Sequence, residues 1–241
     1  MASYTKKIVD VQGSPMECLV FQPDGAGPFP GLVVAQHFPI AHTGLEKDPF
    51  TIDTGERLAK AGYAAIIPFI FHWWPPEEKQ DVKRAEWRDD RLIADLDSAY
   101  DVLCGLGSID KDRIGIIGHC WGGRVAWLGA GRNPNYKVAA VLYGGRIKVA
   151  MGEVSVPPID LAGDMKCAMI GVFGNNDQNP SPDDVKDLDA ALNAAGIEHE
   201  FHCYDGAGHG FQDFCNQDRY REEQSEDAWK KLLFFFDAKL R

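Results

Sequence analysis

A cysteine at position 120 has the sequence setting of a catalytic nucleophile. Residues 118–123 read Gly-His-Cys-Trp-Gly-Gly and directly follow the apolar run Ile114-Gly-Ile-Ile117. A strand that ends in Gly-x-nucleophile-x-Gly before a helix makes a sharp turn, the nucleophile elbow, which needs small residues around the nucleophile. The start of the helix offers free N–H groups and a positive dipole end, which stabilise a thiolate and later an oxyanion. A buried cysteine in a glycine-rich turn, or a phosphate-binding loop, would also account for this short pattern.

A base and an orienting acid follow Cys120 in the chain order of a catalytic triad on a parallel sheet. A thiol attacks as a nucleophile only when a base takes its proton, and the base needs a partner that orients it. Asp177 follows one predicted strand, and His209 lies in a glycine-rich segment after the last predicted strand. Taken singly, Asp177 also fits a turn or helix cap, and His209 a loop histidine packed against Phe211. Together with the elbow, their order favours a triad of Cys120, Asp177 and His209.

Two backbone N–H groups are expected to form an oxyanion hole beside the nucleophile. One belongs to Trp121, the residue after Cys120. The other comes from the loop after the predicted strand at 31–36, where Phe38 is the best candidate. Each such donor contributes about 3–4 kcal/mol of transition-state stabilisation.

Apolar runs and amphipathic stretches alternate along the chain. Strands are predicted at 7–11, 17–22, 31–36, 63–68, 113–119, 138–143, 167–173 and 198–204. Helices are predicted at 52–61, 87–106, 121–131, 181–195 and 224–240, with Ser-Pro-Asp-Asp at 181–184 as a helix start and Gly196 as a stop. The first two strands form an antiparallel hairpin, and the later ones a parallel sheet. We expect one α/β domain over residues 1–241.

The composition argues against several classes of partner. The 241 residues carry a net charge of −11, which disfavours nucleic acid and anionic membranes as partners. The N-terminus has no apolar signal core, and no segment approaches roughly 18 apolar residues. The six cysteines lack Cys-x-x-Cys pairing and disulfide-framework spacing. We therefore expect a cytoplasmic monomer or homodimer that acts on a small molecule.

With these motifs the chain resembles the dienelactone hydrolase (carboxymethylenebutenolidase) family of the α/β-hydrolase fold over nearly its whole length. The resemblance rests on the elbow, Val33-Val-Ala-Gln36, Gly62-Tyr-Ala-Ala65, the acid loop at 174–180 and Gly206-Ala-Gly-His-Gly-Phe211. It implies a mostly parallel central sheet of about eight strands with helices on both faces. It also implies hydrolysis of lactones or small esters through a thioester on Cys120, with no metal or organic cofactor. Acyl transfer, isomerisation and non-catalytic ligand binding on the same fold stay open as alternatives.

Two positions depart from the family pattern. His37 stands where the family has a glutamate that helps to activate the thiol, and an imidazolium there would favour a thiolate at Cys120. Asp213 stands at or beside the place of a family arginine that binds the substrate carboxylate. We expect both His37 and Asp213 to lie in the substrate pocket. Because an aspartate repels a carboxylate, we expect neutral lactones or aryl esters to be preferred.

Aromatic residues on the catalytic side are expected to line the substrate pocket. They follow strand ends, and parallel sheets place ligands beyond the carboxyl ends of their strands, as at residues 69–76 and 143–146. The candidates are Trp73, Trp74, Trp121, Tyr143 and Phe211, joined by Arg84 and Trp87, which loosely echo a second family arginine motif, with Arg88 and Arg91 as rivals. Phe69 and Phe71 belong to the same aromatic segment as Trp73 and Trp74, but we expect these two rings to pack on the core.

Overall fold

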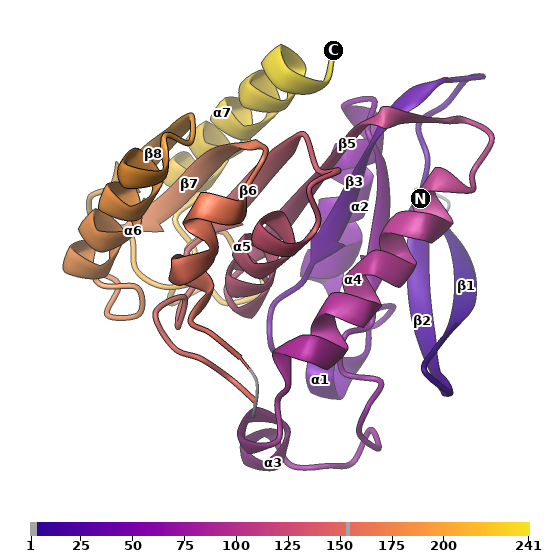
Figure 1. Ribbon diagram of the computed structural model, residues 1–241, viewed down its shortest axis with the longest axis horizontal. Coiled ribbons are helices and arrows are strands. Elements are labelled where there is room, and N and C mark those ends of the chain that lie inside the picture. The colour runs from indigo at the N-terminus through magenta and orange to yellow at the C-terminus, as the bar shows by residue number, and fades with distance from the viewer. Residues whose placement is uncertain (1–3, 153–154) are drawn as a thin grey trace.

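The computed structural model describes residues 4–152 and 155–241. Their eight strands form a single sheet (Figure 1). Its strands are β1 (Tyr4–Val11), β2 (Ser14–Phe21), β3 (Phe29–Ala35), β4 (Ala64–Pro68), β5 (Ile109–His119), β6 (Val138–Leu142), β7 (Ala168–Gly174) and β8 (His199–Tyr204). Their spatial order is β1-β2-β4-β3-β5-β6-β7-β8. The pairs β1–β2 and β2–β4 are antiparallel, and the other neighbouring pairs are parallel. The predicted hairpin and the mostly parallel sheet are confirmed.

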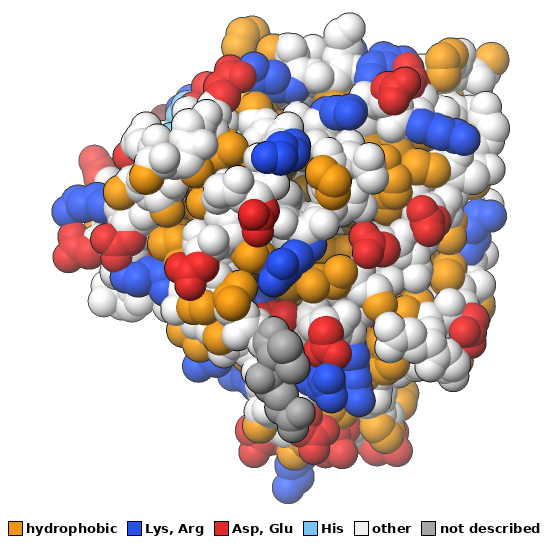
Figure 2. All heavy atoms as spheres, in the orientation of Figure 1, with side chains coloured by type: hydrophobic (Ala, Val, Ile, Leu, Met, Phe, Trp, Pro, Cys, Tyr) orange, Lys and Arg blue, Asp and Glu red, His pale blue; other side chains and the backbone are white. Residues whose placement is uncertain are grey.

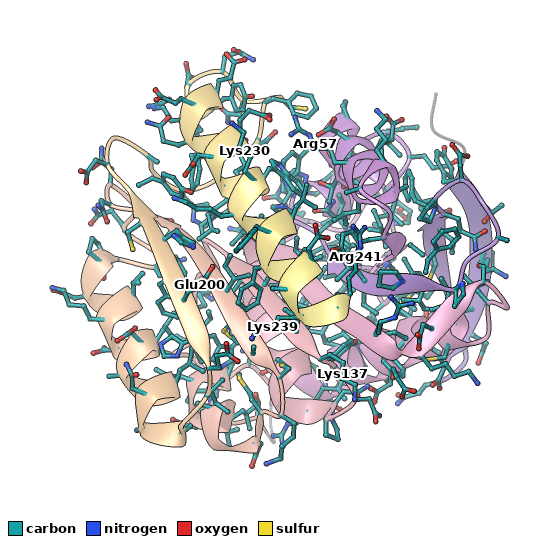
Figure 3. All side chains as sticks on the ribbon, turned by 90° about the horizontal axis from the view of Figure 1, so that it is seen from above. Arg57, Lys137, Glu200, Lys230, Lys239 and Arg241 are labelled. Atoms are coloured by element: carbon teal, nitrogen blue, oxygen red, sulfur yellow. The ribbon has the colours of Figure 1, made fainter. Side chains whose placement is uncertain are left out.

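The predicted helices are present with small shifts at their ends: α2 (Pro49–Lys60), α4 (Asp89–Cys104), α5 (Trp121–Arg132), α6 (Pro182–Ala195) and α7 (Glu222–Leu240). Figure 1 shows α4, α5 and α6 in front of the sheet and α2 and α7 behind it. Seen from above, α7 lies along the sheet and ends beside Arg241 (Figure 3). Among the described residues, no helix has the length and apolar character needed to cross a membrane.

Three short helices were not predicted from the sequence. They are α1 (Ile40–Thr43), α3 (Gln80–Ala85) and the 3₁₀ helix η1 (Pro158–Asp164). Each is too short to show an apolar period, which is the main signal for a helix in a sequence. Strand β1 also begins earlier than predicted, because its first residues are largely exposed and carry no apolar alternation.

The parallel strands in the middle of the sheet are buried on both faces. Strands β4 and β6 are buried along their whole length, and β3 along all but its first residue. Helices on both faces exclude water from them, so they appear in the sequence as continuous apolar runs. On the outer surface, acidic and basic side chains are interspersed over the face shown in Figure 2. Because parallel strands end at the same edge, the loops after β3, β5, β6, β7 and β8 meet there.

The turn between β5 and α5 leaves no room for a side chain two residues before or two residues after Cys120. Cys120 has φ 57° and ψ −117°, a strained conformation that the surrounding structure must hold. A Cβ atom on Gly118 would lie 1.8 Å from the carbonyl oxygen of Gly122. A Cβ atom on Gly122 would lie 2.0 Å from the carbonyl oxygen of Ala35. The first turn of α5 therefore packs backbone against backbone on the end of β3.

We expect Gly122→Ala to lower the free energy of unfolding by at least about 2–3 kcal/mol, because the new methyl group would overlap rigid backbone. Gly163→Ala is the control, since a Cβ atom there meets no atom within 4 Å. That control should change stability by no more than about 0.5 kcal/mol. Urea unfolding of both variants tests this, and equal stabilities would contradict the role given to Gly122.

Candidate active site

Three side chains from separate loops converge at the carboxyl edge of the sheet. His209 Nε2 lies 3.0 Å from Cys120 Sγ, and His209 Nδ1 lies 2.8 Å from Asp177 Oδ2. Cys120 lies between β5 and α5, Asp177 lies in the loop after β7, and His209 lies in the loop after β8. With its Nδ1 proton donated to Asp177, the imidazole presents Nε2 to the sulfur. The structure therefore brings together the three residues that the sequence analysis combined into a triad.

Asp177 is held in place by its own loop. Its side chain is 3% exposed, and Oδ1 accepts a hydrogen bond of 2.8 Å from the backbone N–H of Asn179. The helix that follows does not use Asp177 as a cap, because Ser181 accepts a hydrogen bond from the Asp184 N–H in a capping box. The predicted helix start at Ser181 is thus confirmed, and both oxygens of Asp177 are engaged within the site.

Two backbone N–H groups, those of Trp121 and Phe38, face Cys120 and help to lower the pKa of its thiol. The Phe38 and Trp121 rings pack edge to face with centroids 5.3 Å apart. Phe71 packs against Phe38 at 5.0 Å, and Trp87 packs against Trp121 at 4.9 Å. These aromatic contacts fix the two N–H donors relative to each other, as an oxyanion hole requires.

Trp121 lines the cavity beside Cys120 as expected, but Trp73, Trp74 and Trp87 do not. Trp74 and Trp87 stack at 6.1 Å, and Trp73 Nε1 donates a hydrogen bond of 3.1 Å to Asp95. Trp73, Trp74 and Trp87 line a separate hollow near Leu92 that is too small to hold a water molecule. The prediction that they line the cleft is wrong, because large rings gain more from packing against one another than from facing water.

Tyr143 and Phe211 lie beneath the histidine loop rather than in the cleft. Tyr143 is 1% exposed and Phe211 is fully buried. The Tyr143 ring centroid is 5.6 Å from the His209 ring and 5.6 Å from the Phe211 ring. Their assignment to the pocket lining is therefore wrong. Tyr143 packs against the His209 ring, and Phe211 packs against Tyr143.

The cavity beside Cys120 has a volume of about 210 Å³. Its walls come from α3 and from the loops at the carboxyl edge: Phe38, Arg84, Cys120, Trp121, Gly145, Arg146, Asn179 and His209. The Arg84 guanidinium lies over the Phe38 ring at 4.3 Å from its centroid. In the part of the chain that the structure describes, neither Arg84 nor Arg146 has an acidic partner. Both arginine charges are thus available to a ligand.

Arg146 and Asn179 are wall residues that the sequence analysis did not single out. The Arg146 backbone N–H donates a hydrogen bond of 3.1 Å to the Asn179 side-chain oxygen. A Cβ atom on Gly145 would lie 2.5 Å from Nδ2 of the Asn179 side chain, so the two loops are in close contact. The position of residues 143–146 just after a strand pointed to this edge of the sheet. No short motif marks the contact itself, because it depends on how the loops after β6 and β7 pack.

His37 and Asp213 do not line the cavity. His37 is 5% exposed, and its Nε2 lies 2.9 Å from Asp48 Oδ2. Its Nδ1 faces Asp213 Oδ2 at 4.0 Å. Asp48 is thus a hydrogen-bond partner of one ring nitrogen, and the Asp213 carboxylate lies near the other at a distance too long for a hydrogen bond. The assignment of His37 and Asp213 to the substrate pocket is therefore wrong, and the expected repulsion of anionic substrates by Asp213 loses its basis.

The remaining buried histidines are separate from Cys120 chemistry. Burial lowers the pKa of His119, the residue before the nucleophile, to about 3, so its ring stays neutral. His72 lies 2.9 Å from Asp95 and 2.8 Å from the Ser14 hydroxyl, in a cluster away from the cavity. Within residues 4–152 and 155–241, no group of three or more His, Cys, Asp or Glu side chains is arranged to hold a metal ion.

The Cys120 and His209 side chains stabilise each other's charged forms. Burial by itself raises the pKa of the Cys120 thiol, but the hydrogen bond and charge of His209, with the N–H groups of Trp121 and Phe38, lower that pKa overall. Burial lowers the pKa of His209, but its hydrogen bonds to Asp177 and Cys120 raise that pKa to about 10. Each of these two side chains therefore favours the charged form of the other.

An eight-stranded, mostly parallel sheet with a nucleophile elbow after β5 and a histidine loop after β8 is the α/β-hydrolase fold. The crystal structure of a Klebsiella pneumoniae protein, provisionally named a dienelactone hydrolase, matches with a TM-score of 0.83 and 30% identity. The match covers 98% of this chain and 99% of that one. The sequence model of the dienelactone hydrolase family matches residues 16–240. This chain belongs to the dienelactone hydrolase family and is a hydrolase.

Curated relatives support the same family. A Methylorubrum extorquens protein, provisionally named a carboxymethylenebutenolidase, is 32% identical over 89% of this chain and 74% of its own length. A Bradyrhizobium protein, provisionally named a 2-oxo-3-(5-oxofuran-2-ylidene)propanoate lactonase, is 28% identical over 76% of this chain and 75% of its own length.

At neutral pH, we expect iodoacetamide to alkylate Cys120 much faster than the exposed Cys203 and Cys215. The thiolate is the reacting form, and the pKa of Cys120 is lowered, whereas burial raises the pKa of Cys203 and of Cys215. The alkylation rate of Cys120 should therefore stay high as the pH falls through the usual range of a thiol pKa. It should decline only when the pH reaches the lowered pKa of Cys120. Peptide mass spectrometry after timed alkylation at about pH 5 to about pH 9 measures this.

His209→Gln is the matched variant for this measurement. It removes the imidazolium, so the pH midpoint for alkylation of Cys120 should rise toward the usual range of a thiol. An unchanged midpoint in His209→Gln would show that His209 does not set the charge state of Cys120.

Proposed function

We propose that the protein hydrolyses small esters or lactones through a thioester on Cys120. The observation that carries this proposal is the 3.0 Å contact between Cys120 Sγ and His209 Nε2, with both backbone donors already facing the sulfur. A thiolate held by an imidazolium is a ready nucleophile beside a ready proton donor. A ligand-binding protein has no need of such a pair.

The acylation step uses each of these groups once. The thiolate of Cys120 attacks the carbonyl carbon, and the N–H groups of Trp121 and Phe38 stabilise the negative oxygen that forms. When the bond to the leaving oxygen breaks, His209 gives its proton to that oxygen, and a thioester remains on Cys120. In a lactone the leaving oxygen stays in the same molecule as a hydroxyl group.

The deacylation step needs water and the neutral His209 that the first step produced. His209 takes a proton from water, the water oxygen attacks the thioester, and the thiolate leaves as the carboxylic acid is released. Asp177 stabilises the imidazolium that forms again. Access of water is supported by the exposure of the His209 side chain, which is 29%, and by the partial exposure of Cys120.

We further propose that the substrate carries an anionic group. Arg84 and Arg146 line the cavity with Cys120 and have no acidic partner among the described residues. The name of the Bradyrhizobium relative, a propanoate lactonase, describes a carboxylate substrate and supports the same chemistry. This proposal replaces the preference for neutral substrates expected from Asp213, whose carboxylate faces His37.

Cys120→Ala is expected to lower kcat for phenyl acetate by roughly 10⁴-fold or more, as removal of the nucleophile does in other triad enzymes. Acid quenching of the wild type during turnover should trap an acetyl group on Cys120, which intact-protein mass spectrometry detects. Cys215→Ala, at an exposed cysteine outside the cavity, is the control and should retain wild-type activity. Full activity of Cys120→Ala would end the proposal. Product analysis in water separates hydrolysis from acyl transfer.

A lactone that carries a carboxylate is expected to have a kcat/KM roughly tenfold or more above that of its methyl ester. A charge-assisted hydrogen bond to arginine contributes about 1.5–3 kcal/mol, which corresponds to this ratio. Arg84→Gln and Arg146→Gln should each reduce the ratio, whereas Asp213→Asn should not. A ratio below one in the wild type that rises in Asp213→Asn would restore the role first expected for Asp213.

A further inference from the structure

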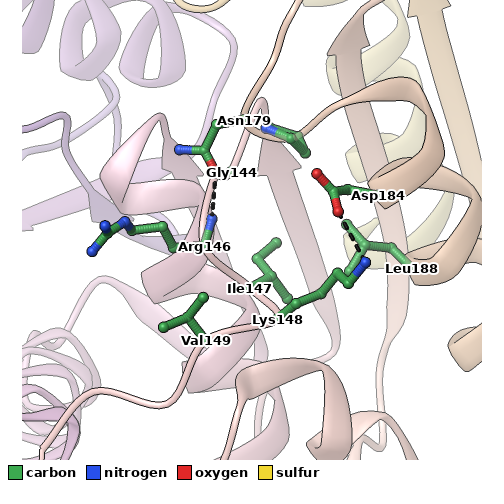
Figure 4. A pocket seen from close by; sticks show the side chains of 9 residues that line it. Gly144, Arg146, Ile147, Lys148, Val149, Asn179, Asp184 and Leu188 are labelled. Atoms are coloured by element: carbon green, nitrogen blue, oxygen red, sulfur yellow. Dashed lines mark hydrogen bonds and ion pairs between the residues drawn. The ribbon is translucent and has the colours of Figure 1, made fainter.

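A second cavity opens beside the Cys120 cavity and shares part of its wall. It has a volume of about 160 Å³ and lies between the loop after β6 and the start of α6. Arg146 and Asn179 line both cavities, and the adjacent glycines Gly144 and Gly145 each line one of them. Figure 4 shows this second cavity, with Arg146 and Lys148 pointing in opposite directions from the loop and Ile147 between them. The two cavities are therefore adjacent and separated by a common wall.

The second cavity presents apolar side chains to its interior. Ile147 and Leu188 are buried core residues, and Val149, which is 45% exposed, stands at its mouth. Two of the polar groups around it, the Lys148 ammonium and the Asn179 side-chain oxygen, have partners within the protein. Lys148 Nζ lies 3.0 Å from Asp184 Oδ1, and the Asn179 oxygen accepts the Arg146 backbone N–H. An apolar group can fill this space without removing a partner from a buried polar atom.

A buried ion pair holds the wall of the second cavity in place. Arg124, on α5, is fully buried and forms a bidentate ion pair with Asp89. Its Nη1 and Nη2 atoms donate hydrogen bonds of 2.6 and 3.0 Å to the two carboxylate oxygens. The same guanidinium donates hydrogen bonds to the backbone oxygens of Arg146, at 3.3 Å, and Val149, at 2.9 Å. The loop therefore cannot collapse into the cavity without breaking charge-assisted hydrogen bonds.

The Arg146 side chain stands between the two cavities. It is exposed, and its guanidinium has no hydrogen-bond or ion-pair partner in the described part of the chain. A substrate that extends from Cys120 into the second cavity can pass beside Arg146 without breaking a contact of that side chain.

We propose that the second cavity is a binding subsite for an apolar substituent of the ester, on its acyl or its alcohol side. The proposal rests on the hydrolase function proposed above. A dry apolar cavity of about 150 Å³ binds benzene, so this one takes a phenyl ring or an alkyl chain of about six carbons. The substrate class is then an ester or lactone with an anionic group near the arginines and an apolar group beyond Arg146.

Two matched ester series test the subsite and identify its occupant. One series keeps the phenol leaving group and lengthens the acyl chain from acetate to octanoate, and the other keeps acetate and lengthens the alcohol. In one series kcat/KM should rise by about three- to fourfold per methylene and stop rising near six carbons. Flat profiles in both series would overturn the subsite. Absence of any Cys120-dependent hydrolysis would instead overturn the proposed function.

Val149→Trp tests the location of the subsite. The indole ring would fill the cavity from its mouth, so the preference for the six-carbon over the two-carbon ester should fall by about tenfold. Val156→Trp is the control, because Val156 is a similarly exposed valine, at 40%, that does not line the cavity. Circular dichroism verifies the fold of both variants. An unchanged chain-length preference in a folded Val149→Trp would show that the apolar group binds elsewhere.

Discussion

The geometry of the candidate site depends on direct backbone contact between the turn after β5 and the ends of β3 and β6, the two strands that flank β5. Gly122 lies against the carbonyl of Ala35 at the end of β3, and a Cβ atom on Gly123 would lie 2.6 Å from the Cα atom of Gly144, just after β6. Because no side chain separates these segments, the first turn of α5 brings its N–H groups next to the loop that carries Phe38. The same packing sets the loop after β6 beside Cys120. The strained backbone of Cys120 is stabilised by this packing, which is how proteins hold such a conformation at a reactive position.

The charge state of the site follows from a balance of burial against hydrogen bonding. Burial opposes charge on both Cys120 and His209, but each supplies the opposite charge that the other needs. Asp177 adds the third contact and is itself fixed by the backbone of Asn179. The N–H groups of Trp121 and Phe38 lie beside the sulfur, so in the proposed reaction they are close to the carbon that the sulfur attacks and can stabilise the oxygen on that carbon. The donors are thus preorganised before a substrate arrives, so little reorganisation is needed during the reaction.

Most side chains that surround the cavity support it rather than line it. The aromatic rings behind Phe38 and Trp121 fix the two donors, and Tyr143 holds His209 from below. The ion pair of Arg124 with Asp89 fixes the loop between the two cavities. Losing one member of such a buried pair leaves an uncompensated charge, so its effect reaches the cavity wall as well as overall stability. The walls that remain open to a ligand are few, and they combine two arginines with an apolar compartment.

The sequence by itself determined the order of the elements, the hairpin, the elbow and the residues that meet as Cys120, Asp177 and His209. These features depend on short-range chemistry: glycine spacing at a tight turn, apolar runs in buried strands, and polar residues just after strand ends. The tertiary structure decided which aromatic rings pack behind the donors, that Asp213 faces His37, and that Arg146 and Asn179 form a shared wall. Those outcomes depend on which loops become neighbours when the sheet forms and on which polar atoms must find partners once buried. No local pattern encodes such neighbours, because they are separated in the chain and meet only when the strands pair.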